Sequence, residues 1–159
     1  MSLTMSETMF QDYLDSPLGI VTVTSRDGVS ICDISFAQPQ HYPSCAITKT
    51  AKQQLAEYFS GQRNHFDLPL NAQGTLFQQR VWRQLQTVTY GKTASYADIA
   101  RAIDNPKGVR AVGMANSRNP IAIVVPCHRV IGANGTLTGY AGGLDKKEWL
   151  LRHEGALGN

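Results

Sequence analysis

The residues best suited to chemistry stand together at Pro126-Cys127-His128-Arg129-Val130, directly after the apolar run Ile121 to Val125. A thiol is a useful nucleophile only as the thiolate, and a free cysteine titrates at about 8.5. An adjacent imidazole, a positive charge or the start of a helical turn lowers that pKa. We therefore predict an activated thiol at Cys127. Neighbouring side chains in a strand point apart, so a contact between Cys127 and His128 requires a turn or a bridging water.

A third group should orient the imidazole of His128, as in other nucleophile–base pairs. The C-terminal half offers few acids for this role. Glu154 is the most attractive because it ends the last predicted helix. The full set of candidates is Asp98, Asp104, Asp145, Glu148 and Glu154.

The other two cysteines are expected to be passive, Cys32 as a small buried residue of a strand and Cys45 as a loop thiol. With His41 and His65 they form no short metal-ligand pair, so we expect no metal site. An odd count of three cysteines and an N-terminus without a secretory signal pattern favour reduced thiols in the cytosol. No apolar run approaches the roughly 20 residues that a membrane helix needs.

Positive charge gathers before the thiol. The chain has 159 residues and a net charge of +3, and five Lys or Arg but only one acid lie between Arg101 and Arg129. A basic segment of this kind suits a polyanion such as a nucleic-acid backbone. A solvated surface is the alternative, and charge alone does not decide between them.

The N-terminal part, residues 1–72, reads as a small sheet with one helix. Strands are predicted at 10–14, 20–24 and 29–34, with Arg26-Asp27-Gly28 as a hairpin signal between the last two. Alternation in the third strand would place Val29, Ile31 and Asp33 on one face. A helix is predicted over 48–59, and residues 68–74 read as a linker.

The C-terminal part, residues 73–159, reads as mainly helical, which makes the chain an α+β protein of two domains. Thr75 and Ser95 are predicted to cap the first two helices. The first carries an apolar stripe of Phe77, Val81, Trp82 and Leu85. A break at 104–108 separates the second helix from a third over 109–117, and a last helix is predicted over 144–153.

The second and third helices form a candidate helix-turn-helix, although an ordinary helical hairpin has the same pattern. Val109, Val112 and Asn116 would face the core, which leaves Ala111, Gly113 and Ala115 as a nearly bare outer surface. A glycine inside a helix costs about 1 kcal/mol relative to alanine, so something must favour Gly113. A slim helix suits the minor groove and binding that ignores base sequence, and Arg110 is the long side chain placed to enter the base stack.

These motifs resemble one family. The segment Pro126 to Val130, the preceding Asn119-Pro120, the following Gly139-Tyr140-Ala141-Gly142-Gly143 and the terminal Lys147 to Glu154 resemble the methylated-DNA–protein-cysteine methyltransferases, and the constitutive bacterial type most. The resemblance is dense from about Thr75 to Glu154 and looser before it, where Ser16-Pro17-Leu18-Gly19 fits.

The resemblance implies a repair reaction in which Cys127 takes the alkyl group from O6 of guanine, and possible acceptance of O4-alkylthymine. His128 would act through a water as the base, oriented by Glu154. Tyr96 would help to rotate the nucleotide out of the duplex and donate to the departing base. Asn119 would tie the recognition helix to the active-site segment.

The resemblance also implies where the DNA lies. Arg110 would fill the gap left in the duplex, with Ala111, Gly113, Tyr96 and Arg129 as further DNA contacts. The carbonyls of Cys127 and Val130 would accept the guanine amino group. The backbone near Tyr140, Ala141 and Gly142 would face O6, and Ala141 stands where many relatives have serine.

A thioether formed on Cys127 cannot be removed by any group in the chain, so we expect one turnover per molecule and no cofactor. The expected partner is double-stranded DNA bound through the minor groove by a monomer, with no membrane involved. Two alternatives remain from the residues alone. One is a DNA-binding regulator for which Cys127 is dispensable, and the other is a cysteine hydrolase with many turnovers.

Overall fold

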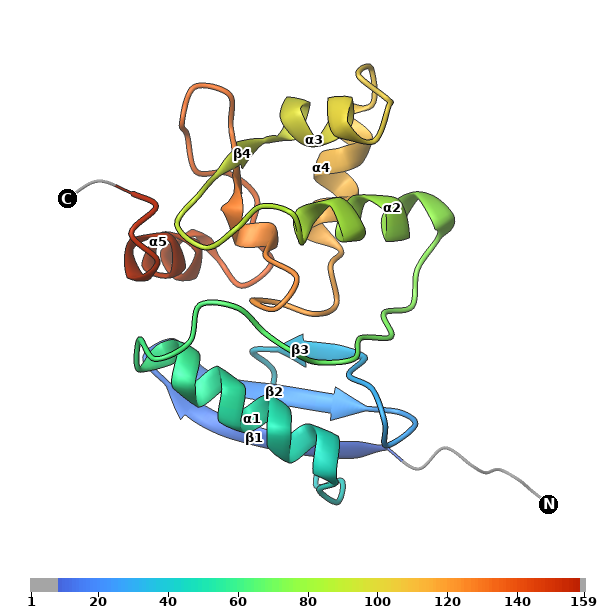
Figure 1. Cartoon of the computed structure of the whole chain (residues 1–159), viewed down its shortest axis with the longest axis vertical. Helices are drawn as coiled ribbons and strands as arrows, with labels where there is room; N and C mark the ends of the chain where they lie inside the picture. Colours follow the sequence, from blue (N-terminus) through green and yellow to red (C-terminus); the bar gives the residue numbers. More distant parts are fainter. Residues whose placement is uncertain (1–8, 158–159) are drawn as a thin grey trace. The chain divides into compact units, whose positions relative to one another are not determined.

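The chain divides into two compact units, Met1–Gln73 and Gly74–Asn159 (Figure 1). The computed structural model describes residues 9–157, so part of the N-terminal stretch behind the expectation of no secretory signal lies outside the described residues. The expected α+β class is confirmed: a sheet with one helix comes first, and helices dominate the second unit. In residues 9–157 no helix is both long and apolar enough to cross a membrane.

The first unit is built on an antiparallel sheet of three strands in the order β1-β2-β3. Strand β1 spans Phe10–Ser16, β2 spans Gly19–Ser25 and β3 spans Asp33–Ser35. Helix α1, Ala46–Phe59, packs against β1 and β2 (Figure 1). The core between helix and sheet contains fully buried apolar side chains from β2, β3 and α1, namely Val21, Val23, Ile34, Ala51, Leu55 and Tyr58.

The third strand is shorter than predicted. Asp27 accepts hydrogen bonds from the backbone N–H of Val29 and of Ser30, both at 2.9 Å. These two donors are therefore taken by a side chain and not by a strand partner. As a result Val29 is 68% exposed while Ile31 is fully buried, so the prediction that they share one face is wrong.

Part of the predicted linker belongs to the first unit. The amide of Ile31 donates to Pro69 O at 2.8 Å, and the amide of Asn71 donates to Ile31 O at 2.8 Å. Leu70 forms an isolated parallel bridge with Ile31. The chain is thus held to the edge of this unit before it enters the second.

The second unit is a helical cluster with a short strand pair. Its helices are α2 (Leu76–Leu85), α3 (Tyr96–Ala102), α4 (Val109–Ser117) and α5 (Leu144–His153). Strand β4, Ala94–Ser95, runs parallel to β5, Val130–Ile131. The 3₁₀ turn η1, Cys127–Arg129, precedes β5 and contacts α2 and α5. Helices α2, α3 and α4 pack on one another.

The two predicted helix caps are confirmed. Thr75 Oγ1 accepts from Gln78 N at 3.1 Å, and Gln78 Oε1 accepts from Thr75 N at 2.9 Å. Ser95 and Asp98 form the same reciprocal pair at the start of α3. Each pair satisfies backbone donors that have no partner within the helix, so the sequence signals mark the first residues of both helices.

Helix α4 buries a different face from the one predicted. Val112 and Asn116 face the core as expected, but Ala115 is only 2% exposed and its carbonyl accepts from Trp82 Nε1 at 2.8 Å. Val109, expected to be buried, is 38% exposed. The bond from Trp82 on α2 sets this rotation, so the small outer surface of α4 is formed by Ala111 and Gly113 without Ala115.

We predict that Thr75→Ala destabilises the protein by about 1 kcal/mol, because the backbone N–H of Gln78 at the start of α2 loses the hydroxyl that accepts from it. Urea unfolding measures the change, and Thr75→Ser is the matched control because it keeps the accepting hydroxyl. Equal stability of the alanine and serine variants would contradict the role of the cap.

Candidate functional site

The segment before Cys127 is a tight turn. Val125 N donates to Ile121 O at 3.0 Å and Cys127 N donates to Val125 O at 2.8 Å. Ile123 has φ of 72°, a region that β-branched residues rarely occupy. The turn therefore stores backbone strain next to the thiol and must be held by other contacts.

Asn119 supplies those contacts. Its Nδ2 donates to Val125 O at 2.8 Å, and its Oδ1 accepts from Ile121 N at 3.0 Å. Asn119 thus braces the turn from within. A second residue, Asn116 of α4, donates from Nδ2 to Cys127 O at 3.3 Å. This direct link between α4 and the thiol residue was missed from the sequence, where Asn116 read only as a core-facing position.

The Cys127 thiol is buried and 6% exposed. Burial raises its pKa, and the side chain of Asn119 and the charge of Lys147 oppose this only in part. The resting group is therefore the neutral thiol, and the expected lowering of its pKa is wrong in direction. Desolvation of an anion outweighs the nearby positive charge here.

Two residues beside the thiol meet one carboxylate. His128 Nε2 lies 2.8 Å from Glu154 Oε2, and both side chains are fully buried. Arg129 binds the same carboxylate in a fork, with Nε donating to Oε1 at 2.8 Å and Nη2 to Oε2 at 3.1 Å. The pairing of His128 with Glu154 expected from the resemblance is present in the geometry.

Arg129 departs from its expected place. It is 7% exposed, and its remaining amino group donates from Nη1 to Val88 O at 2.6 Å. A guanidinium enclosed in this way cannot reach a DNA phosphate or base. We therefore revise the expectation that Arg129 contacts DNA, since its charge is used within the protein.

The protonation states follow from burial and from this pairing. Burial by itself would raise the pKa of Glu154, but its hydrogen bonds and charge contacts with His128 and Arg129 hold that pKa at about 2. Burial lowers the pKa of His128 against the pull of Glu154. Glu154 is thus a carboxylate and His128 a neutral imidazole, whose Nδ1 has no hydrogen-bond partner within residues 9–157.

The strand pair brings Tyr96 to the same region. Ala94 pairs with Val130, so the first residue of α3 follows directly from the strand beside η1. Tyr96 Oη donates to Thr138 O at 3.1 Å and accepts from Thr138 Oγ1 at 3.3 Å. The loop after β5 is thereby attached to the tyrosine.

Lys147 is the second residue that the sequence reading missed. It is fully buried, and its Nζ donates to Val130 O and to Thr138 O, both at 2.6 Å. Burial lowers its pKa to about 8. A sequence signal was available, since Lys147 lies three and four residues before the apolar Leu150 and Leu151 and so shares their helix face.

The residues expected to form the base pocket differ from one another in exposure. Val130 is buried with its carbonyl bonded to Lys147, while Ala141 is exposed and Gly142 half-buried. The hydroxyl end of Tyr140 is buried, and burial raises its pKa well above the usual value. Across the described residues no group of three or more His, Cys, Asp or Glu is placed to hold a metal ion, and Cys32, Cys45 and Cys127 are free thiols.

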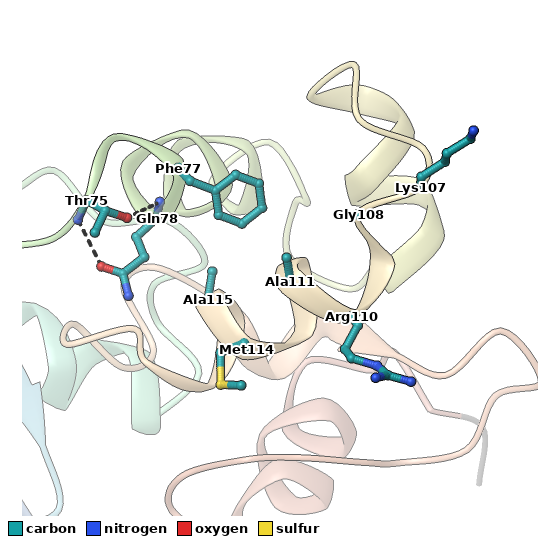
Figure 2. A pocket seen from close by; sticks show the side chains of 9 residues that line it. All are labelled: Thr75, Phe77, Gln78, Lys107, Gly108, Arg110, Ala111, Met114 and Ala115. Atoms are coloured by element: carbon teal, nitrogen blue, oxygen red, sulfur yellow. Dashed lines mark hydrogen bonds between the residues drawn. The ribbon is translucent and has the colours of Figure 1, made fainter.

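A cavity of about 570 Å³ lies apart from the thiol, between the start of α2 and the outer side of α4 (Figure 2). In Figure 2 the side chain of Arg110 extends from α4 away from the side chains of α2. The lining combines small and apolar residues with two cations, namely Thr75, Phe77, Gln78, Lys107, Gly108, Arg110, Ala111, Met114 and Ala115.

Comparison with known proteins identifies the family. Residues 76–156 match the DNA binding domain of 6-O-methylguanine DNA methyltransferase, and residues 9–72 match its ribonuclease-like domain. The chain belongs to the 6-O-methylguanine DNA methyltransferase family.

Individual members are similar over nearly the whole length. The chain is 49% identical over 148 residues to the methylated-DNA–protein-cysteine methyltransferase of Mycolicibacterium paratuberculosis, with 89% of each chain covered. The O6-methylguanine methyltransferase of Mycobacterium tuberculosis has a TM-score of 0.85 at 42% identity over 95% of both chains. OGT of the same organism, in complex with DNA, has a TM-score of 0.85 at 44% identity, with 92% of this chain and 93% of that chain covered.

We predict that Glu154→Gln destabilises this methyltransferase-family chain by about 3–5 kcal/mol, because Arg129 becomes a buried charge without its partner. Chemical unfolding measures the loss. Glu148→Gln is the matched control, since its ion pair with Arg152 is half-exposed and spans one helical turn, and removing it should cost below about 0.5 kcal/mol. Similar losses in both variants would refute the special position of Glu154.

Proposed function

We propose that this protein repairs DNA by rotating an O6-alkylguanine out of the duplex and taking the alkyl group onto Cys127, once per molecule. Family membership together with a buried thiol next to a paired imidazole and carboxylate supports this reaction. Residues 73–159 bind DNA and react, and residues 1–72 support them. The protein acts as a monomer in the bacterial cytosol.

The reaction begins at a neutral thiol. His128 takes the proton of Cys127 at Nδ1 through a water, while its Nε2–H stays bonded to Glu154. The sulfur attacks the alkyl carbon, so a C–S bond forms and the bond from that carbon to O6 breaks. The electron pair goes to the guanine ring, which takes up the proton released by the thiol and leaves as neutral guanine.

Two groups assist the transfer, Tyr96 at the departing base and Lys147 at the thiolate. Tyr96 gives up its bond to the carbonyl of Thr138 and donates its one hydroxyl hydrogen to the base as negative charge develops there. Lys147 places a positive charge near Cys127 and so favours the transient thiolate. Lys147 is held by two carbonyls before the substrate arrives, so its charge needs little rearrangement during the transfer.

DNA binds through its minor groove to the outer side of α4. Ala111 and Gly113 add little bulk to that side. The side chain of Arg110 extends from α4 (Figure 2) and would fill the gap left by the rotated nucleotide. Among the described residues, the nearest neighbour of a Cβ added at Gly113 would be the Tyr96 ring at 3.8 Å, which is ordinary contact. Packing within the protein therefore does not require glycine, and close approach of a DNA backbone explains it.

The cavity beside α4 extends this surface. Lys107 and Arg110 supply positive charge, and Phe77 and Met114 supply apolar area suited to deoxyribose. Such contacts carry no base sequence information, as a protein that seeks lesions anywhere in DNA requires.

The transfer is tested by mixing the protein with a duplex that contains one O6-methylguanine. We expect the intact mass to rise by one methyl group, located on Cys127 by peptide mapping, with one lesion repaired per molecule. Cys127→Ser should bind the duplex without taking up methyl, whereas Cys32→Ser and Cys45→Ser should react normally. Unmodified protein with unchanged DNA would exclude the proposal, and repeated turnover of an ester or peptide would favour a cysteine hydrolase.

The minor-groove contact is tested by Gly113→Ala. The variant should gain about 0.5–1 kcal/mol of stability, because alanine favours the helix, and should lose affinity for duplex DNA. Gly113→Leu should weaken binding further. Thermal unfolding and fluorescence anisotropy measure the two effects, and DNA affinity that does not change along this series would contradict the placement of α4.

A further inference from the structure

The carboxylate of Glu154 is in an unfavourable place for a negative charge. Glu154 is the C-cap of α5, where the helix dipole is negative, and the residue is only 5% exposed. An ion in such a position persists only with a well-placed counter-charge and satisfied hydrogen bonds. Arg129 supplies both, because its fork reaches each carboxylate oxygen.

Arg129 is itself held on three sides. Besides Glu154 it binds the carbonyl of Val88, and its guanidinium carbon lies 5.8 Å from the centre of the Tyr90 ring. A side chain fixed in this way has essentially one orientation, so the carboxylate that it grips is fixed as well.

Because Arg129 holds Glu154 as a carboxylate, it determines which nitrogen of His128 carries the hydrogen. A carboxylate accepts hydrogen bonds but cannot donate them, so the nitrogen that faces it, Nε2, must carry the hydrogen. In a neutral imidazole the other nitrogen, Nδ1, then keeps its lone pair. Only that tautomer can accept the thiol proton in the proposed transfer.

Without Arg129 the balance between neutral and protonated His128 changes. A buried carboxylate that has lost its cation gains most by pairing with a protonated His128, and an imidazolium has no lone pair on Nδ1. Lys147 still opposes that protonation, but its ammonium bonds Val130 and Thr138 and not Glu154. The charged groups that act on this imidazole are Glu154, Arg129 and Lys147. Two tyrosines act on its partners: Tyr140 interacts with Cys127 and Glu154, and Tyr90 with Glu154 and Arg129.

We propose that Arg129 is a positioning residue for alkyl transfer: it keeps Glu154 an ionised, fixed acceptor, and thereby keeps His128 in the neutral form whose Nδ1 takes the Cys127 proton. This inference rests on the proposed function, since it assigns a role within the same reaction. It differs from the sequence expectation, which placed Arg129 on the DNA.

The pH dependence of single-turnover methyl transfer tests the role. In the wild type the rate should stay flat down to mildly acidic pH. In Arg129→Met it should fall about tenfold per pH unit below a raised midpoint and recover just above that midpoint, because only neutral His128 accepts the proton. Arg129→Lys should move the profile back toward the wild type. Arg152→Met, which removes an exposed arginine from α5, is the control and should keep the wild-type profile.

A ¹⁵N NMR spectrum of the His128 imidazole tests the same idea without the reaction. The wild type should show hydrogen on Nε2 only at neutral pH, and Arg129→Lys should retain more of this form than Arg129→Met. A proton on Nδ1 in the wild type, or identical pH profiles in folded Arg129→Met and wild type, would overturn the role of Arg129. If Arg129→Met does not fold, the wild-type spectrum and Arg129→Lys decide. Absence of methyl transfer in the wild type would instead refute the proposed function, while the spectrum still reports on Arg129.

Discussion

The second unit depends on one buried carboxylate shared by two neighbours in η1. Glu154 at the end of α5 receives His128 and Arg129 together, and Arg129 continues to the carbonyl of Val88. Three segments far apart in the chain are thereby joined at one point. A buried ion pair is a weak source of stability, because desolvation offsets much of its attraction. It is geometrically demanding, however, and the position of the thiol beside it follows from that demand.

The charges around Cys127 suit the thiolate that forms during the proposed reaction more than they suit the resting thiol. Arg129 is balanced by Glu154, while Lys147 has carbonyl partners and, within residues 9–157, no bound carboxylate. The surroundings of Cys127 therefore carry an excess of positive charge, although burial keeps the resting thiol neutral. A neutral buried thiol is protected from oxidation and adventitious reaction, and the excess charge becomes useful when the proton leaves.

The helix proposed to meet DNA is bonded to the reactive segment. Asn116 of α4 donates to the carbonyl of Cys127, and Trp82 of α2 fixes the rotation of α4 through Ala115. The outer side of α4 and the thiol are therefore held in a defined relation within one unit. This rigidity suits a reaction in which a base leaves the duplex beside the helix and must arrive at the sulfur in one orientation.

The sequence by itself determined the α+β class and the first residues of α2 and α3, because caps and periodicity are local signals. The resemblance of its motifs predicted the pairing of His128 with Glu154 that the structure contains, while Cys127 as the nucleophile stays a prediction. The sequence failed where distant groups compete. Asp27 captured the amides of a predicted strand, and Trp82 turned Ala115 inward. Burial raised the pKa of Cys127 instead of lowering it. Only the tertiary structure directed Arg129 to Glu154 and buried Lys147, since a long cation can reach solvent or a buried partner, and the partner lies on another segment.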